Sequence, residues 1–513
     1  MLEKLKQLAE QFAAAGVDRA FGVTGSGATW NLIDQLEIRG IKYFPVGHEA
    51  AGAIMAGGAW KANGKPALSL SIKGPGLLNS LPGIAYNHFE NQPVVSIAES
   101  YGSSTPNGQM HKRVNQSSLL QPLVRGITGL NDPPNDIPQL WAASNSGVLG
   151  PVHVELNDLT LMVPPLPRKV EDNLGPALNL IAKSRKPILI VGNLARQFGL
   201  ADQIKELRIP VFTTAAAKGI IDENKQWAAG IYTGTGGPLS PESSLMKSSD
   251  LIVGIGLRNL EIISPKNFDQ SAVLMDLPGI DAALGFGASV NICHPSEDAF
   301  RELLTALTKF EWGDAETEKC VKKLDQILQS NWLPAACFQY LNQLDNNYSL
   351  IADTGSFCTV AEHIWKASPE RPFVGSSNGR YMGCAIPTAI GYAAASQRRP
   401  VYCAVGDGGM RQYPGELKIA VEHSLPICVL FMSDGRYGSI GCAQGKRKLP
   451  IHAITMPGPS WENVVRGMGC QSRHIETFNA FKAAIDTWDN RSPLFLECVF
   501  DSDEYLLMTN NIR

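Results

Sequence analysis

The sequence predicts an α/β protein of three domains, each a mostly parallel sheet flanked by helices. The chain has 513 residues, which suggests three or four domains at roughly 100–200 residues per domain. Short apolar runs bounded by Gly or Pro, among them PALSLSI, QPVVSIAES, KPILIVGN and PVYCAVGDGG, alternate with amphipathic stretches. Apolar strands separated by helices are typical of parallel sheets that are covered on both faces.

The domain boundaries follow from changes in composition along the chain. We expect an N-terminal domain over 1–165, a central domain over 174–310 and a C-terminal domain over 330–513. The stretch VPPLPRKVEDN separates the first two, because proline continues neither a helix nor a central strand. The charged stretch EWGDAETEKCVKKLDQILQSN is predicted to be a helix that leads into the third domain.

Composition and charge exclude several classes of function. The 45 Lys and Arg residues against 48 Asp and Glu residues give a net charge of −3, without a broad basic surface for nucleic acid. No apolar run reaches the roughly 18 residues of a membrane-spanning helix, and the N-terminus lacks the pattern of a signal peptide. The cysteines and histidines lack zinc-ligand spacing. We therefore expect a cytoplasmic protein that binds neither membranes nor nucleic acid.

The segment AVGDGGMRQYPGELKIAVEHSLPICVLFMSDG carries the most informative motif. One predicted strand ends at Asp407 and the next at Asp434, with a helix between them. Because parallel strands end at the same sheet edge, where open α/β sheets bind ligands, the two carboxylates can converge. Two carboxylates beside glycine-rich backbone suit a divalent cation that is bound to phosphate oxygens. A GDGG run alone would more often be a simple turn.

These motifs resemble those of the thiamine-diphosphate-dependent enzymes of the acetolactate synthase, pyruvate decarboxylase and benzoylformate decarboxylase type. The resemblance implies that Asp407 ligates Mg²⁺, that Asp434 stands where the family has Asn, and that the backbone carbonyl of Arg436 is a third ligand. How the additional negative charge of Asp434 affects the metal stays open. The residues that the resemblance assigns to thiamine diphosphate are Gly355, Ser356, Met382, Gly406, Gly408, Gly409, Met410, Tyr437, Gly438 and Ser439.

The N-terminal domain carries the catalytic part of the resemblance. The run FPVGHEAAGAIMAGGAWKANGKPALSLSIKGPG resembles the family's HE and GPG segments, which implies that Glu49 is the catalytic glutamate. It would exchange a proton with a ring nitrogen of the cofactor, whereas a lone Glu after a strand would ordinarily be a solvated cap. His111 is a candidate proton relay. Met382 would hold the cofactor in a bent shape, and the alternative is a core methionine.

The substrate is expected between the cofactor and loops near residues 23–27, 73–76 and 108–113. Where acetolactate synthases have small, apolar and Gln-Glu residues, this chain has cations at Lys73, His111, Lys112 and Arg113. They form either a solvated basic surface or a pocket for a substrate with a second anionic group. The residues assigned to substrate binding are Gly25, Ser26, Lys73 and Lys112.

The resemblance implies an enzyme that uses thiamine diphosphate and Mg²⁺ to decarboxylate a 2-oxo acid without oxidation. Whether the product is released, or is joined to a second carbonyl as in acetolactate synthases, stays open, and so does the identity of the acid. The resemblance also implies a homodimer or homotetramer with active sites between subunits. The alternatives are an FAD-containing enzyme like pyruvate oxidase, although the central domain lacks a GxGxxG motif, and a catalytically silent regulatory subunit, against which Glu49 argues.

Overall fold

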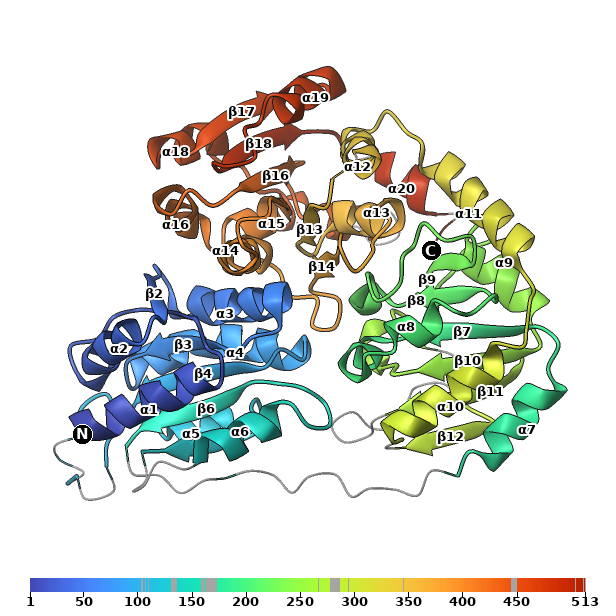
Figure 1. The fold of residues 1–513 in the computed structure, drawn as a ribbon. Coiled ribbons are helices and arrows are strands. Elements are labelled where there is room, and N and C mark those ends of the chain that lie inside the picture. The colour runs from blue at the N-terminus through green and yellow to red at the C-terminus, as the bar shows by residue number, and fades with distance from the viewer. Residues whose placement is uncertain are drawn as a thin grey trace.

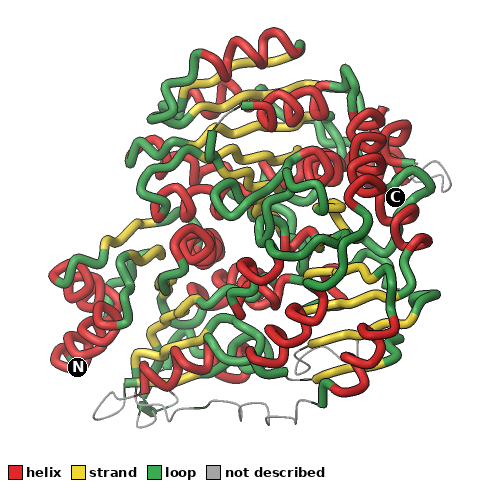
Figure 2. The backbone as a smooth tube through the Cα atoms, turned by 45° about the vertical axis from the view of Figure 1, so that its right-hand side comes forward, coloured by secondary structure: helices red, strands yellow, loops and turns green. Residues whose placement is uncertain are grey.

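A computed structural model contains three six-stranded sheets, and every pair of neighbouring strands in them is parallel (Figures 1 and 2). This confirms the predicted fold class. Helices cover both faces of each sheet, and the strands are buried on both faces, as in β3 and β7. The structure describes the whole chain except residues 103–104, 107, 109, 131–135, 158–161, 163–172, 266, 277–286, 294, 345, 444–449, 503, 511 and 513.

The first sheet has the strand order β2-β1-β3-β4-β6-β5. The predicted boundary at residue 165 lies outside the described residues. The strands are β1 Arg19–Gly22, β2 Lys42–Pro45, β3 Ala67–Ser71, β4 Val94–Glu99, β5 Ile127–Gly129 and β6 Val152–Leu156, and the helices are α1 Leu2–Ala14, α2 Ala28–Ile38, α3 Glu49–Asn63, α4 Pro75–Phe89, α5 Gln116–Leu120 and α6 Asp136–Ser144.

The middle sheet has the order β12-β11-β10-β7-β8-β9, with the order reversing between β10 and β7. Its strands are β7 Pro187–Val191, β8 Val211–Thr213, β9 Ala228–Ile231, β10 Leu251–Ile255, β11 Ser271–Asp276 and β12 Val290–Cys293. Its helical elements are α7 Gly175–Lys183, η2 Asn193–Phe198, α8 Ala201–Ile204, η3 Ala215–Ala217, α9 Pro241–Ser248, η4 Asn259–Glu261 and α10 Glu297–Leu307. The charged helix α11, Asp314–Leu328, then leads to the third domain, as its sequence predicts.

The third sheet has the order β14-β13-β15-β16-β18-β17. Its strands are β13 Ser349–Ala352, β14 Phe373–Gly375, β15 Val401–Gly406, β16 Ile427–Ser433, β17 Gln471–Ile475 and β18 Leu494–Val499. Its helical elements are α12 Leu333–Gln343, α13 Ser356–Ile364, α14 Ala385–Ala395, α15 Asp407–Met410, η5 Pro414–Glu416, α16 Leu417–Glu422, α17 Gly438–Ala443, η7 Ile451–Ala453, α18 Trp461–Gly467, α19 Phe478–Asp486 and α20 Glu504–Thr509.

The first and third sheets share one strand order, in which the first strand lies between the second and the third. Chain connections therefore leave the first and third strands of each sheet in opposite directions. Such a switch point opens a crevice at the carboxyl ends of the strands, and open α/β sheets bind their ligands there. The topology thus marks the turns after β13 and β15, and those after β1 and β3, as the places to look for a site.

The first and third domains pack together through α3 and α14, which lie side by side in Figure 1. Both helices are rich in Ala and Gly. A Cβ atom added at Gly58 would lie 2.3 Å from the carbonyl oxygen of Thr388, and one at Gly391 would lie 1.9 Å from that of Met55. Only glycine allows the two backbones to approach so closely. These contacts also fix the helices as antiparallel, because residue numbers rise along one as they fall along the other.

Within the part of the chain that the structure describes, no helix combines the length and apolar character needed to cross a membrane.

Candidate functional site

A cavity of about 220 Å³ opens at the switch point of the third sheet. The turns after β13, β15 and β16 and the segment before α14 form its walls. Met410 is the exception among the residues predicted in this domain, since its side chain is buried in the core behind the cavity. The predicted residues that line the cavity are Gly355, Ser356, Met382, Gly406, Asp407, Gly408, Gly409, Asp434, Arg436, Tyr437, Gly438 and Ser439.

Glycine keeps this cavity open. A Cβ atom at Gly408 would lie 2.5 Å from the sulfur of Met382, and one at Gly438 would lie 2.3 Å from Oδ2 of Asp434. Any side chain at these positions would displace its neighbours or fill the space. The glycines therefore leave a backbone-lined wall that an anionic group can approach closely.

Two carboxyl groups meet at one end of the cavity, as the motif predicts. Asp407 accepts hydrogen bonds from the N–H of Asp434 at 2.9 Å and of Gly435 at 3.1 Å, and from the hydroxyl of Ser433 at 3.1 Å. Oδ1 of Asp434 accepts the N–H of Arg436 at 3.2 Å, whereas its buried Oδ2 has no hydrogen-bond partner among the described residues and lies 3.9 Å from Nε of Arg436. Burial, together with the charge of Asp407, raises the pKa of Asp434 to about 7. A buried pair of acidic side chains suits a cation.

A third carboxyl group, Asp353, lies behind the cavity, and sequence reasoning did not identify it. The side chain is fully buried and accepts the N–H of Thr354 at 2.7 Å and of Gly383 at 2.9 Å. Gly383 directly follows Met382, so Asp353 fixes one end of the segment that carries this methionine. An Asp at the end of the apolar run SLIAD was the available signal.

The other end of that segment is held from the first domain. Glu90, which follows α4 and is 3% exposed, accepts the hydroxyl of Ser376 at 3.0 Å and the N–H groups of Asn378 at 3.2 Å and Gly379 at 2.8 Å. Glu90 and Ser376 are 286 residues apart in the chain. No local pattern in the sequence could have paired them.

Glu49 lies away from the cavity of its own chain. It begins α3, is half-buried and accepts a hydrogen bond from Nδ2 of Asn79 at 3.2 Å. Met382 lies just before α14, and α14 runs antiparallel to the 15 residues of α3. Glu49 and Met382 are therefore at opposite ends of the helix pair, which are roughly 20 Å apart at about 1.5 Å per residue. One chain does not bring them together.

The first domain has an open cleft of its own, about 580 Å³ in volume, with Lys73, Tyr101, Lys112 and Arg113 among its lining residues. Nζ of Lys73 lies 3.1 Å from a carboxylate oxygen of Glu99 and 5.3 Å from the centre of the Tyr101 ring. Although burial opposes it, hydrogen bonds from Thr29 and Lys73 lower the pKa of Glu99. The charge of Lys73 is therefore largely neutralised within the protein.

The other residues predicted in this domain border the cleft less directly. The loop after β1 contacts Glu99, because a Cβ atom at Gly27 would lie 2.6 Å from its carboxylate. Gly25, in the same loop, packs against Ile72, which follows β3, and Ser26 is exposed. His111 is exposed, its carbonyl accepts the Tyr101 hydroxyl at 2.7 Å, and it is not part of the described lining of the cleft.

An internal carboxylate occupies part of the switch point of the middle sheet. A carboxylate oxygen of Glu261 accepts the N–H of Asn193, at the turn after β7, at 2.8 Å, and also a hydrogen bond from the hydroxyl of Thr214. A Cβ atom at Gly256 would lie 2.4 Å from the backbone nitrogen of Ala195, so the turns after β7 and β10 touch. A backbone amide that could have bound the diphosphate of a dinucleotide is thus occupied by an internal carboxylate.

Comparison with known families agrees with this geometry. The chain matches the models of the thiamine pyrophosphate enzyme N-terminal TPP binding domain over residues 5–119, central domain over 174–278 and C-terminal TPP binding domain over 353–498.

The chain is also similar to named proteins over most of its length. It is 24% identical to a probable acetolactate synthase large subunit of Methanocaldococcus jannaschii, over 96% of this chain and 91% of that protein. It is 24% identical to the acetolactate synthase isozyme 3 large subunit of Escherichia coli, over 86% of this chain and 83% of that protein. It is 21% identical to an acetolactate synthase of Bacillus subtilis, over 90% of this chain and 86% of that protein.

Replacing Asp353 with Asn tests the buried carboxyl group. Burial raises the pKa of Asp353 to about 7, whereas an unfolded Asp has a pKa of about 3.9. The folded chain then binds more protons than the unfolded chain between roughly pH 4 and pH 7, so the contribution of this group to stability falls as the pH rises through that window. Asn has no charge to bury. The free energy of unfolding of Asp353→Asn, measured relative to that of wild type, should therefore rise by on the order of 2 kcal/mol from pH 5 to pH 8.

Thermal unfolding of the cofactor-free protein at the two pH values measures this change. The Tm of Asp353→Asn relative to wild type should be higher at pH 8 than at pH 5 by about 4–8 °C for a domain of this size. Asp34→Asn, at an exposed position on α2, is the control and should differ from wild type equally at both pH values. An Asp353→Asn difference that does not change with pH would show that this carboxyl is not buried in its charged form.

Proposed function

This chain belongs to the thiamine pyrophosphate enzyme family, and on that basis we propose that it uses thiamine diphosphate and Mg²⁺ to decarboxylate a 2-oxo acid without an external oxidant. The product is either released or joined to a second carbonyl, as the names of the acetolactate synthase relatives suggest. The observation that carries the proposal is the cavity of the third domain, where the acid pair Asp407 and Asp434 faces a glycine-lined wall.

The residues present fit both groups. A divalent cation would use Asp407, a carboxylate oxygen of Asp434 and the backbone carbonyl of Arg436, and it would compensate two carboxyl groups that burial otherwise penalises. Gly408 and Gly409 would leave room for the oxygens of a diphosphate. When bound, thiamine diphosphate supplies the electron sink that accepts the electrons of the breaking carbon–carbon bond.

We propose that each active site is formed by two chains. Glu49 and Met382 are at opposite ends of the α3–α14 pair, so one chain cannot present both to a single cofactor. The first and third sheets have the same strand order. A second copy related by a two-fold axis can therefore place its Glu49 beside this chain's cavity while receiving this chain's Glu49 in return. The expected assembly is a homodimer or a dimer of dimers.

Glu49 is proposed to hold a proton at the pyrimidine nitrogen of the cofactor. Its carboxyl group is half-buried at the start of α3, and Asn79 donates a hydrogen bond to one oxygen, which leaves the other to face a ligand. Met382 would pack against the cofactor and hold it in its bent shape. Its position is determined by hydrogen bonds to Asp353 and Glu90 on either side of it, so the methionine is held firmly although its side chain is flexible.

The substrate is proposed to approach from the cleft of the first domain, near Gly25, Ser26, Lys73 and Lys112. Because Lys73 is paired with Glu99, Lys112 is the better candidate for contact with a second anionic group of the substrate. Lys112 has a φ angle of 63°, which is uncommon for a residue other than glycine and is often found at functional sites. His111 remains a candidate proton relay. An FAD-dependent reaction is disfavoured because Glu261 accepts the N–H of Asn193, the backbone amide at the turn after β7 that a diphosphate would use.

Release of CO₂ tests the proposed reaction. Purified protein with thiamine diphosphate and Mg²⁺ is given pyruvate, aromatic 2-oxo acids, 2-oxoglutarate, sulfopyruvate and phosphonopyruvate. Glu49→Gln should retain cofactor binding but lose at least about 100-fold in rate, because the amide cannot exchange the proton. Glu37→Gln, at an exposed position on α2, should retain full activity. Equal rates for Glu49→Gln and wild type would rule out the assigned role.

Mixing two inactive variants extends this test to the assembly. Co-assembled Glu49→Gln and Asp407→Asn chains should regain activity that neither variant has alone, because each mixed dimer contains one site free of both substitutions. Absence of recovery, with mixed dimers demonstrated by mass, would contradict a site formed by two chains.

Asp434→Asn tests the metal site. The amide retains an oxygen ligand but removes a negative charge beside Asp407 and the diphosphate, so Mg²⁺ should bind as tightly as in wild type or more tightly. Titration with Mg²⁺ in the presence of thiamine diphosphate, followed by tryptophan fluorescence, gives the affinity. Asp407→Asn is the comparison and should weaken binding at least about tenfold, a loss of 1.4 kcal/mol. Mg²⁺ binding that Asp407→Asn leaves unchanged would mean that the metal binds elsewhere, and complete loss with Asp434→Asn would mean that the charge of this carboxylate is required.

A further inference from the structure

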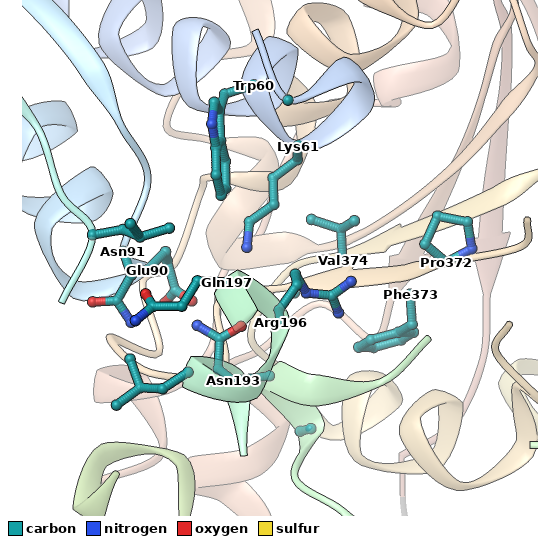
Figure 3. Close-up of a pocket in the computed structure, with 16 residues that line it drawn as sticks. Trp60, Lys61, Glu90, Asn91, Asn193, Arg196, Gln197, Pro372, Phe373 and Val374 are labelled. Carbon is teal, nitrogen blue, oxygen red and sulfur yellow. The ribbon is translucent and has the colours of Figure 1, made fainter. Parts of the chain in front are cut away.

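A buried carboxylate from the opposite domain holds each end of the α3–α14 pair. At the C-terminal end of α3, Glu90 of the first domain accepts N–H groups from the third-domain segment that leads to Met382. Figure 3 shows Glu90 at that end, beside a cavity of about 230 Å³ that residues of all three domains line and into which Lys61 extends from α3. At the N-terminal end the roles of the domains are exchanged, because Glu416 of the third domain contacts the segment that leads to Glu49.

Glu416 contacts the backbone immediately before Glu49. Its Oε2 accepts the N–H of Gly47 at 3.1 Å, and a Cβ atom at Gly47 would lie 3.0 Å from its Oε1. The side chain is 3% exposed. Burial raises the pKa of Glu416, whereas the N–H groups of Gly47 and His48 lower it. Because a buried carboxylate is costly unless it is hydrogen-bonded, the two residues that precede Glu49 stabilise the charge of Glu416 in this position.

Ring packing and a helix cap also hold this segment. The centre of the His48 ring lies 5.6 Å from that of Tyr413 in the third domain, and Nδ1 of His48 accepts the N–H of Ala50 at 3.1 Å. His48 is the N-cap of α3, and Glu49 is the first residue of that helix. A shift of the backbone at Gly47 and His48 would therefore move Glu49 directly.

Sequence position alone would assign Glu416 to the cavity of its own chain. It ends η5, a few residues after the glycine turn at 407–410, and Gln412 between them packs against Gly383. Glu416 is, however, not part of the described lining of that cavity, and it accepts its hydrogen bond from the first domain. The distinction matters in the proposed two-chain enzyme, because the cavity of a chain belongs to one active site and its Glu49 belongs to the other.

We propose that Glu416 is a positioning residue for Glu49 and thus acts on the active site that its chain completes in the partner, not on its own cavity. This role rests on the proposed function, in which Glu49 exchanges a proton with the cofactor. Proton transfer requires the two groups to lie within hydrogen-bond distance, and a misplacement of about 1 Å can cost on the order of 100-fold in rate. Glu416 therefore affects the rate of the reaction rather than the affinity for the 2-oxo acid.

Glu416→Ala removes the carboxylate and should lower kcat about tenfold or more, while KM for the 2-oxo acid changes less than about twofold. In the cofactor-free protein, the amides of residues 46–50 should exchange hydrogen faster by mass spectrometry, because this segment loses its contact with the third domain. Glu422→Ala removes an equal charge from an exposed position on α16 and should change neither result. Glu416→Gln keeps the volume and one acceptor oxygen, so it should give smaller changes in the same direction and replaces Glu416→Ala if that variant does not fold.

Mixed dimers, isolated with a different affinity tag on each chain, identify the site on which Glu416 acts. Paired with Asp407→Asn, a Glu416→Ala chain supplies an intact cavity and receives a correctly held Glu49, so about half of the wild-type activity per dimer should return. Paired with Glu49→Gln, it can supply only its own misplaced Glu49 to an intact cavity. The activity of this second pair should be at least about tenfold lower than that of the first.

The opposite pattern, or equal recovery with both partners, would overturn the proposal, because Glu416 would then act on its own cavity or on neither site. Unchanged hydrogen exchange at residues 46–50 in the folded Glu416 variants would overturn it whatever reaction the protein catalyses. The pair Glu49→Gln with Asp407→Asn is the reference. Absence of recovery in that pair would contradict the two-chain site itself, and the hydrogen exchange and the change in kcat would then decide on Glu416.

Discussion

Helices α3 and α14 approach each other so closely that a backbone carbonyl of one occupies the place of a side chain on the other. Glycines at 58 and 391 make this contact possible, and the rest of the molecule is arranged around it. The contact holds the first domain against the third and orients the helices antiparallel. As a result, the N-terminal end of α3, with Glu49, lies at the opposite end of the helix pair from the segment that contains Met382. A site that needs both residues has to be completed by another chain.

Each of the three sheets has a switch point, and the residues around it differ from sheet to sheet. At the switch point of the third sheet, glycines keep a cavity open beside an acid pair. At that of the first sheet, Glu99 and Lys73 neutralise each other beside a wider cleft. At that of the middle sheet, Glu261 takes the backbone amide of Asn193 and the turns close together. Parallel sheets create the crevice, and the residues at the strand ends decide whether it remains available.

Buried carboxyl groups connect these regions. Asp353 and Glu90 hold the two ends of the segment that contains Met382, one from within the third domain and the other from the first. Glu90 also lines the cavity between the domains. Each of these groups loses solvation on folding, and backbone N–H groups compensate part of that loss. The cost is consistent with a need to hold the segment that contains Met382 rigidly rather than with stability alone.

The sequence by itself determined the three-sheet fold and the cavity motif of the third domain, because both depend on patterns within short stretches of contiguous residues. Apolar runs between Gly and Pro mark the strands, and the GDGG and SDG turns directly follow two strands that end at one sheet edge. Only the tertiary structure decided that Lys73 pairs with Glu99, that Glu90 anchors residues 286 positions away, and that Lys61 and Arg196 face one cavity. These relations depend on which strands become neighbours and how two domains pack, and local sequence patterns carry no information about either. For the same reason Glu49 could be proposed as the catalytic glutamate from its motif, whereas its separation from Met382 follows only from the antiparallel packing of α3 and α14.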